Sequence, residues 1–261
     1  MAQPGPRGTD MITFDALQGL AADATLQTLK RPAFRDLQRS LAFLTYTPGT
    51  IDGKYGPRTR ATWAEFKHVN GEDGASDAVN PSALQTLATK TGGMDQLLSA
   101  AAPDAEAVKA SIVATCRAAG LGLKAQIAYV LATAEWETNH TFKPVREAYW
   151  VRNAEAWRKA NLRYWPYYGR GYVQLTWKDN YDHYGRILGL DLVTNPDQAL
   201  NHYGSLFVLV QGFKTGAFTG HKLGEYVNAA GANFKAARYC INGQDRAADI
   251  AALAESYLKT L

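Results

Sequence analysis

The sequence predicts a mainly α-helical protein in which a small three-helix domain precedes a larger helical domain. Apolar residues recur at helical spacing along most of the chain, as at Phe34, Leu37 and Leu41. The alternating pattern typical of strands is confined to short stretches such as Tyr172–Thr176. A segment of small residues that ends in proline predicts a linker over residues 93–103.

The composition is typical of a soluble globular protein with one large domain or two modest ones. The chain has 261 residues, of which 46% are hydrophobic and 20% charged. No apolar run approaches the roughly 20 residues of a membrane helix, and the first residues lack the apolar core of a secretory signal. We therefore expect that the protein does not insert into a membrane. We also expect that it is made in the cytoplasm without a signal peptide. The wide spacing of Cys116 and Cys240 favours two buried thiols over a disulfide.

The net charge of +4 is concentrated in one part of the chain. Residues 1–100 carry ten basic and ten acidic side chains, whereas residues 143–178 carry eight basic side chains against Glu147 and Glu155. This positive stretch predicts an anionic partner: a cell-wall polymer, lipopolysaccharide or nucleic acid.

Three helices are predicted in the first domain, residues 1–92. The first has an apolar face that continues to Leu44, and the second has Trp63 and Phe66 on its inner face. The third begins at Asn80-Pro81, an N-cap followed by proline, and buries Leu84 and Leu87. Residues 47–57 are rich in proline and glycine and are predicted to form a loop.

This arrangement resembles the peptidoglycan-binding domain of cell-wall hydrolases over about residues 30–90. The matching residues are Leu37-Gln38, Asp52-Gly53-Lys54-Tyr55-Gly56, Thr59 and Phe66. The resemblance implies that the first domain binds the bacterial wall, and a spacer bundle that binds nothing is the alternative. A calcium loop is excluded because the alternating Asp/Asn ligands and the closing Glu are missing.

The second domain, residues 104–261, shows a series of helical patterns. Asp104 is the predicted N-cap of the first helix. A long helix follows from about Leu123 to Thr138. Its apolar stripe consists of Ile127, Val130, Leu131 and Ala134. Further helices are predicted over residues 180–188, from Asn195-Pro196 through Leu200 towards Val210, and over residues 250–261.

The stretch from Tyr164 to Trp177 holds six aromatic rings and two glycines around Arg170. Aromatic faces suit the flat faces of sugars, glycines allow a ligand to approach the backbone, and Gln174 and Thr176 supply polar groups. A tyrosine-rich core strand with a glycine turn is the alternative reading of the same stretch.

Within this stretch, Tyr167–Trp177 resembles the signature of the glycoside hydrolase family 19 chitinases and related phage endolysins. Trp136-Glu137-Thr138 resembles the family's His-Glu-Ser/Thr element, and residues 241–245 resemble its Ile-Asn-Gly segment. The resemblance covers about residues 104–261 and implies a lysozyme-like, mainly helical catalytic domain. Trp136 in place of His, and Asn139-His140 in place of small residues, depart from the pattern.

Hydrolysis of a glycosidic bond requires a proton donor for the leaving oxygen and a second carboxylate to assist attack. The resemblance assigns the proton donor to Glu137, and burial beside Trp136 would raise its pKa to about 6. Glu135 lies about 200° around the same helix, so the two acids cannot face one cleft. Helical spacing alone does not choose between them, and the resemblance favours Glu137.

We predict that Glu147 is the second carboxylate, unless it forms a structural ion pair with Arg146. The resemblance implies inversion at the anomeric carbon, with Thr176 holding the attacking water. The predicted substrate-binding residues are Tyr168, Arg170, Gln174, Asn180 and Asn242. Asn180 as a helix cap and Asn242 as a turn residue are the structural alternatives for the two asparagines.

Other chemistries fit the sequence less well. The five histidines lack metal-ligand spacing and the Gly-Arg-Gly triplet lacks the features of a phosphate loop, so we expect no metal or other cofactor. No Gly-x-Ser-x-Gly motif occurs. We expect no nucleic-acid partner, because paired carboxylates would repel phosphate.

The sequence therefore predicts a monomeric endolysin that binds bacterial peptidoglycan and cleaves its β-1,4 glycosidic bonds. It would act on the wall in the periplasm after release, aided by a holin. The alternatives are a chitinase, a lytic transglycosylase, and a non-catalytic wall-binding or tail-structural protein.

Overall fold

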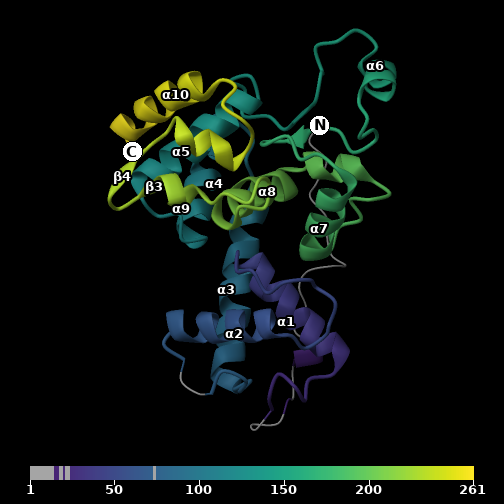
Figure 1. The fold of residues 1–261 in the computed structure, drawn as a ribbon, viewed down its shortest axis with the longest axis vertical. Helices are drawn as coiled ribbons and strands as arrows, with labels where there is room; N and C mark the ends of the chain where they lie inside the picture. Colours follow the sequence, from purple (N-terminus) through teal and green to yellow (C-terminus); the bar gives the residue numbers. More distant parts are fainter. Residues whose placement is uncertain (1–14, 18–19, 21–23, 73–74) are drawn as a thin grey trace. The chain divides into compact units, whose positions relative to one another are not determined.

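The computed structural model describes residues 15–17, 20, 24–72 and 75–261, and these residues are mainly helical, which confirms the predicted fold class. The chain divides into two compact units (Figure 1). One contains residues 97–184 and 191–261, and the other contains the described part of residues 6–96 together with residues 185–190. The prediction that the chain has no secretory signal rests on its first residues, which lie outside the described residues. Within the described residues, none of the helices has the length and apolar character needed to span a membrane.

The smaller unit consists of the short 3-10 helix η1 (Asp15–Leu17) and three α-helices. The α-helices are α1 (Arg31–Phe43), α2 (Pro57–Val69) and the greater part of α3 (Pro81–Ser99). The predicted apolar residues meet in one core, where Phe34, Leu37, Leu41, Trp63, Phe66 and Leu87 are all buried. Leu44 and Leu84 pack at its edge. Helical periodicity therefore located this core correctly.

The loop before α2 is held by a buried side chain of α1. The Gln38 side chain accepts hydrogen bonds from the backbone N–H groups of Asp52 (3.1 Å) and Gly53 (2.8 Å) and donates one to Thr59 (3.2 Å). Gln38 is 2% exposed. Gln38, Asp52, Gly53 and Thr59, which belong to the motif that resembles a peptidoglycan-binding domain, thus stabilise the loop from inside.

The predicted linker over residues 93–103 is helical in its first seven residues, because α3 continues to Ser99. Met94 and Leu98 are buried, and the burial of two large apolar side chains outweighs the low helix propensity of Gly92 and Gly93. Residues 100–103 leave the helix.

The larger unit is built around five longer helices, with short elements between them. The longer helices are α4 (Ala105–Ala118), α5 (Lys124–Glu137), the first part of α7 (Lys178–Leu188), α8 (His202–Thr215) and α10 (Ala247–Thr260). The short helices are α6 (Ala154–Asn161), α9 (Leu223–Tyr226), η2 (Pro196–Leu200) and η3 (Ala236–Cys240). β1 (Val145–Arg146) pairs antiparallel with β2 (Arg170–Gly171), and β3 (Val227–Asn228) pairs with β4 (Gly231–Ala232).

Helix α5 is the centre of this unit. Residues 126–134 are buried on every side of the helix, and α4, α8 and α10 pack against it (Figure 1). The predicted stripe of Ile127, Val130, Leu131 and Ala134 is confirmed as part of this core. The side chain of Asp104 accepts the N–H of Ala107 (2.9 Å), so the predicted N-cap of α4 is confirmed as well.

Both cysteines are free and buried, as predicted. Burial raises the pKa of the Cys116 thiol, and it raises the pKa of Cys240 to about 12. Neither thiol is therefore a nucleophile at neutral pH.

Two further predictions of local structure are wrong. Residues 172–176 are not a strand: Gln174 has a positive φ of 54°, and the chain turns so that Arg170 and Leu175 exchange backbone hydrogen bonds. Their alternating pattern reflects a tight turn with Tyr172, Val173 and Leu175 buried. The helix predicted from residue 195 towards 210 is interrupted at Asn201, whose extended backbone separates η2 from α8.

Candidate active site

The end of α5 opens into a hollow of about 530 Å³, which we call the glutamate hollow. It is lined by Trp136, Glu137, Asn139, His140, Val145, Arg146, Tyr149, Trp150 and Gln174. Asn139 and His140 adopt positive φ values of 49° and 62°, which turn the chain away directly after the helix. The tight turn around Gln174 brings this residue of the aromatic stretch to the same hollow.

The carboxylate of Glu137 is held by an arginine from a distant part of the sequence. Arg238 Nη1 donates to Glu137 Oε1 at 2.8 Å, and its Nε donates to the carbonyl of Asp245 at 3.1 Å. The Glu137 and Arg238 side chains are 17% and 5% exposed. The expected apolar surroundings of Glu137 beside Trp136 are therefore wrong, since a buried guanidinium neutralises the carboxylate.

Glu135 has a different environment. Its Oε1 is 2.7 Å from His140 Nδ1, and its Oε2 accepts a hydrogen bond from Tyr257 of α10. Its side chain thus connects helices within the fold, whereas Glu137 lines the hollow. The two acids therefore have different surroundings, and the choice of Glu137 over Glu135 stays a prediction.

Glu147 lies just after β1, and its carboxylate is fixed by two donors from the aromatic stretch. The Tyr164 hydroxyl donates to Oε1 and the Gly169 N–H donates to Oε2, each at 2.8 Å. The alternative of an ion pair between Glu147 and Arg146 is wrong, because Arg146 binds Asp197 at 2.8 Å. Glu147 is adjacent in sequence to Arg146 of the glutamate hollow but does not line that hollow itself.

Gln174 and Thr176 lie on the same turn. The Gln174 amide donates to the carbonyls of Val145 (3.2 Å) and Gly171 (3.3 Å), which fixes the turn against β1. Thr176 is half-buried, and its carbonyl accepts the side-chain amide of Asn180 at 2.9 Å. Asn180 lies in the first turn of α7. Its amide nitrogen binds the turn that contains Gln174 and Thr176, so its side chain does not cap the helix through its oxygen.

Asn242 is exposed in the loop between η3 and α10. Its side-chain oxygen accepts the N–H of Gly243 at 2.8 Å, the contact of a turn residue. It lines neither of the two hollows described for this unit.

A second hollow of about 810 Å³, which we call the arginine hollow, adjoins the first. Its lining consists of Pro144, Val145, Arg146, Tyr149, Glu155, Arg158, Pro166, Tyr168, Arg170, Asn195, Pro196 and Asp197. Val145, Arg146 and Tyr149 line both hollows, so the two form adjoining parts of one groove.

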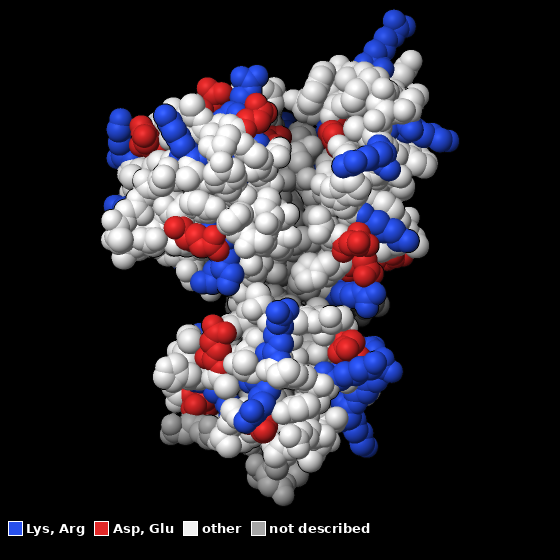
Figure 2. All heavy atoms as spheres, in the orientation of Figure 1, with Lys and Arg blue, Asp and Glu red and all other residues white. Residues whose placement is uncertain are grey.

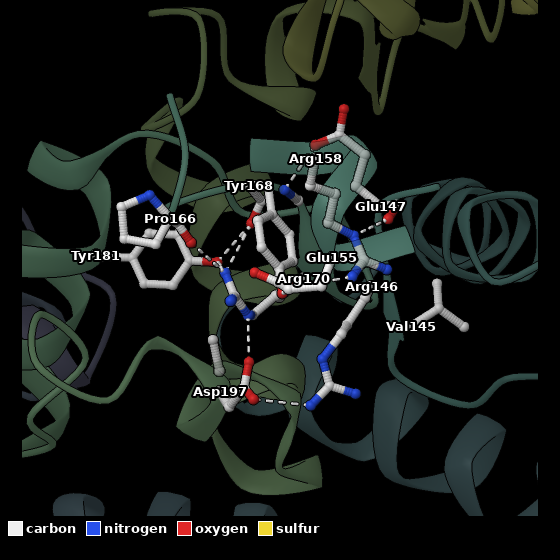
Figure 3. A network of polar contacts seen from close by, with 12 residues as sticks. Val145, Arg146, Glu147, Glu155, Arg158, Pro166, Tyr168, Arg170, Tyr181 and Asp197 are labelled. Carbon is white, nitrogen blue, oxygen red and sulfur yellow. Dashed lines mark hydrogen bonds and ion pairs between the residues drawn. The ribbon is translucent and has the colours of Figure 1, made fainter. Parts of the chain in front are cut away.

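The predicted substrate-binding residues Tyr168 and Arg170 line the arginine hollow, and Figure 3 shows them side by side in one network of polar contacts. Arg170 lies 3.7 Å from the centre of the Tyr168 ring, and Arg158 lies 4.7 Å from it. The Tyr168 hydroxyl donates to Glu155 Oε2 at 3.0 Å, and Arg170 Nε donates to Asp197 Oδ1 at 2.8 Å. Tyr168 and Arg170 are 2% and 3% exposed, so this part of the hollow is rigid and largely preformed.

The acids of the arginine hollow are ionised over a wide pH range. Burial acts to raise the pKa of Asp197, but hydrogen bonds from Arg146 and Arg170 outweigh it and hold the pKa below its usual range. The pKa of Glu155 is lowered in the same way, where hydrogen bonds from Trp165, Tyr168 and Arg158 outweigh burial.

The surface of the larger unit is hollowed between the side that carries α10 and the side that carries α6 and α7 (Figure 2). Lys and Arg side chains project from the α6 and α7 side. Large aromatic side chains are exposed in the same part of the chain, including Trp150 (74%), Trp165 (38%) and Trp177 (44%). A groove bordered by exposed rings and cations suits a polymer with hydroxyl and anionic groups.

Sequence reasoning missed three residues that hold predicted site residues in place: Tyr164, Asp197 and Arg238. Tyr164 was seen as one ring of the aromatic stretch, and no spacing in the sequence connects Arg238 or Asp197 with their partners. Arg238 lies 101 residues from Glu137, and Asp197 lies 27 residues from Arg170. Only the tertiary fold brings these side chains together.

A partly buried carboxylate at the wall of a groove with exposed aromatic rings is an arrangement that glycoside hydrolases use. Sequence comparison agrees: the family described as chitinase class I, glycoside hydrolase family 19, matches residues 106–208. The chain carries a glycoside hydrolase family 19 domain over that range. The match includes Glu137, Glu147, Thr176 and both walls of the groove, and it ends before Arg238 and Asn242.

Curated relatives share a short part of this domain. The chain is 69% identical to Chitinase 11 of Oryza sativa subsp. japonica over 32 residues and 49% identical to Basic endochitinase B of Arabidopsis thaliana over 43 residues. These alignments cover 12% and 14% of this chain, and 12% and 13% of the relatives' own lengths. Inactive chitinase-like protein 1 of Hevea brasiliensis is 61% identical over 31 residues, which are 12% of this chain and 10% of the relative. The shared stretch therefore does not by itself decide whether a protein is active.

Proposed function

We propose that this protein is an endolysin that hydrolyses the β-1,4 glycosidic bonds of bacterial peptidoglycan. The observation that carries the proposal is the position of Glu137, a partly buried acid at the wall of a groove that also contains the signature residue Gln174. The domain belongs to a class of glycosidases, and the positive charge of residues 143–178 favours an anionic polymer over a neutral one.

In the proposed reaction, the Glu137 carboxyl group takes up a proton when substrate binds and donates it to the glycosidic oxygen as the bond to the anomeric carbon breaks. A water molecule attacks this carbon from the opposite face, and Glu147 accepts the proton of that water. Thr176 orients the water. Because both Glu147 oxygens accept hydrogen bonds, from Tyr164 and Gly169, the water has to share or replace one of these contacts. The product then carries a new reducing end of inverted configuration.

We further propose that the smaller unit binds the wall and that the protein acts as a monomer. Peptidoglycan lies outside the cytoplasmic membrane, so the protein would act in the periplasm after release, aided by a holin. The buried contacts of Gln38 support a rigid Asp52–Gly56 loop as the presented surface.

Product analysis on purified murein sacculi tests the proposed reaction. We expect soluble fragments with ordinary reducing ends by mass spectrometry, initially of inverted anomeric configuration by NMR. A majority of 1,6-anhydro ends would instead assign a lytic transglycosylase. Tight binding to sacculi without any released fragment would assign a non-catalytic wall-binding protein.

Chitin hydrolysis is the second candidate function, and the family match and the names of the plant relatives favour it. The two candidates differ in substrate charge, since chitin is neutral. Comparison of kcat/KM on chitin oligosaccharides and on soluble peptidoglycan fragments decides between them. A higher value on chitin would replace the proposed substrate and leave the reaction type unchanged.

A further inference from the structure

We propose that the arginine hollow binds a carboxylate carried by the glycan, so that the protein selects an acid-bearing glycan over a neutral one. Peptidoglycan, whose sugars carry lactyl ethers and acidic peptide stems, has such carboxylates, whereas chitin has none. This inference rests on the proposed function and adds to it a binding site and the substrate group that the site takes.

The position of the hollow supports this role. Val145, Arg146 and Tyr149 line both hollows, so a chain bound beside Glu137 passes Arg146 when it extends along the groove. A side group on a neighbouring sugar then reaches the arginine hollow. The site therefore lies beside the reacting bond rather than at it.

The charges in the hollow leave an unbalanced cation. Arg146, Arg158 and Arg170 face Glu155 and Asp197, so three positive charges against two negative charges leave one positive charge. A single carboxylate balances this charge. A phosphate group with two negative charges would exceed it.

Two of the three arginines are structural. Arg170 is 3% exposed and donates to Asp197, to the carbonyls of Pro166 and Tyr168, and to the Tyr181 hydroxyl. Arg158 is 4% exposed and donates to Glu155 (3.1 Å) and to the carbonyl of Glu147 (2.6 Å) (Figure 3). These contacts hold both guanidinium groups against the Tyr168 ring.

Arg146 is the arginine that a ligand can reach. Its side chain is 42% exposed, and its Nη2 donates to Asp197 Oδ2 at 2.8 Å. A guanidinium carries five N–H donors, and a carboxylate can accept two of them in parallel. Asp197, itself 50% exposed, holds Arg146 in place on one side, and Arg146 lines both hollows. Asn195, exposed on the same rim, adds an amide donor.

Calorimetric binding of soluble peptidoglycan fragments to the full-length protein tests the proposal. Fragments with free stem carboxylates are compared with the same fragments after amidation of those carboxylates. We expect the free acids to bind about tenfold more tightly, as suits one charge-assisted contact at a half-exposed arginine. The difference should shrink as salt is raised from about 0.05 to 0.5 M, because exposed charges are screened.

Substitution of Arg146 locates the effect. Arg146→Gln should reduce the tenfold difference to about twofold, whereas Arg152→Gln should retain it, because Arg152 is exposed and lines neither hollow. Asp197→Asn changes the balance in the opposite direction, from one excess positive charge to two. It should tighten binding of the free acids several-fold and leave the amidated fragments unchanged, so the proposal stays testable if Arg146→Gln folds poorly.

Equal dissociation constants for free and amidated fragments with the wild-type protein would overturn the inference, as would a preference that both Arg146→Gln and Asp197→Asn leave unchanged. Fragment release from sacculi would still support the proposed hydrolase in either case. Conversely, a charge-dependent dissociation constant without any fragment release would overturn the hydrolase and support the carboxylate site.

Discussion

Glu135 and Glu137 are two residues apart on α5, yet their side chains have different partners. Glu135 contacts His140 and Tyr257, which ties the end of α5 to α10. Glu137 lines the groove and is paired with the buried guanidinium of Arg238. A buried ion pair contributes little net stability, but removal of one partner leaves an uncompensated charge. Arg238 therefore holds Glu137 in position, and removal of Arg238 would leave the Glu137 charge without a partner.

We predict that Arg238→Met lowers the free energy of unfolding by about 3 kcal/mol, because Glu137 loses its charge partner in a site that is 17% exposed. The rate on peptidoglycan fragments should fall at least about tenfold, since the acid is no longer held in one orientation. Urea unfolding and initial rates measure the two effects. Arg117→Gln, a change at an exposed arginine of α4, serves as the control and should alter neither. Wild-type stability in Arg238→Met would show that the pair is not formed in solution.

The sequence predicted Glu137 because the residues around it form a recognisable local motif. It could not predict Arg238, because their contact depends on the packing of η3 beside the end of α5, over 101 residues of chain. Similarly, an ion pair between Arg146 and its neighbour Glu147 was the structural alternative, but Arg146 pairs with Asp197. Adjacent residues on a strand point to opposite faces, so sequence proximity was a poor guide to this ion pair.

At the scale of elements, periodic helices were predicted well and tight turns were not. The stripe of α5 is buried as expected, because helical spacing is the main signal of a packed face. Residues 172–176 showed the alternation of a strand, but the left-handed Gln174 makes them a turn that is fixed by hydrogen bonds to Val145 and Gly171. The interruption between η2 and α8 at Asn201 was also not predicted, because no proline or glycine stands at that position.

The start of α8 contains a pH-sensitive contact. His202 Nδ1 lies 2.8 Å from the Tyr172 hydroxyl, and within the described residues its Nε2 is buried without a hydrogen-bond partner. Burial lowers the pKa of His202 from its ordinary value near 6.5. The unfolded chain therefore takes up a proton at a higher pH than the folded chain does.

We predict that this histidine makes the protein less stable as the pH falls below about 6.5. The stability that the neutral His202 side chain contributes is fully present above about pH 6.5. It is lost as the pH drops towards the lowered pKa of His202 in the folded state. Thermal unfolding at pH 7.5 and 5.5 measures it, and the decrease in Tm should be smaller for His202→Gln than for the wild type. An equal decrease in both proteins would mean that other groups cause the pH dependence.

At the scale of the whole molecule, the two units have separate cores, and all proposed catalytic residues belong to the larger one. The loop proposed to present the wall-binding surface belongs to the smaller one. Gly53 in this loop has a φ of 73°, and a Cβ at this position would lie 2.6 Å from the carbonyl oxygen of Arg31. Any larger residue at this position therefore distorts the loop.

We predict that Gly53→Ala destabilises the smaller unit by about 1–2 kcal/mol, because of both the positive φ and the close approach. Binding to intact sacculi should weaken several-fold, while kcat/KM on soluble glycan fragments should stay within about twofold of the wild type. Gly56→Ala is the matched control, since a Cβ there would meet open space. Equal losses on sacculi and on soluble fragments would contradict the division of roles between the units.

The central claim is that Glu137 supplies the proton that breaks the glycosidic bond. The most direct test compares the initial rate of fragment release from sacculi by the wild type, Glu137→Gln and Glu135→Gln, at equal concentrations of folded protein. We predict a loss of at least about a hundredfold for Glu137→Gln, the low end of what general acid catalysis contributes, and a loss below about threefold for Glu135→Gln. A near-wild-type rate for Glu137→Gln, or a larger loss for Glu135→Gln, would contradict the assignment.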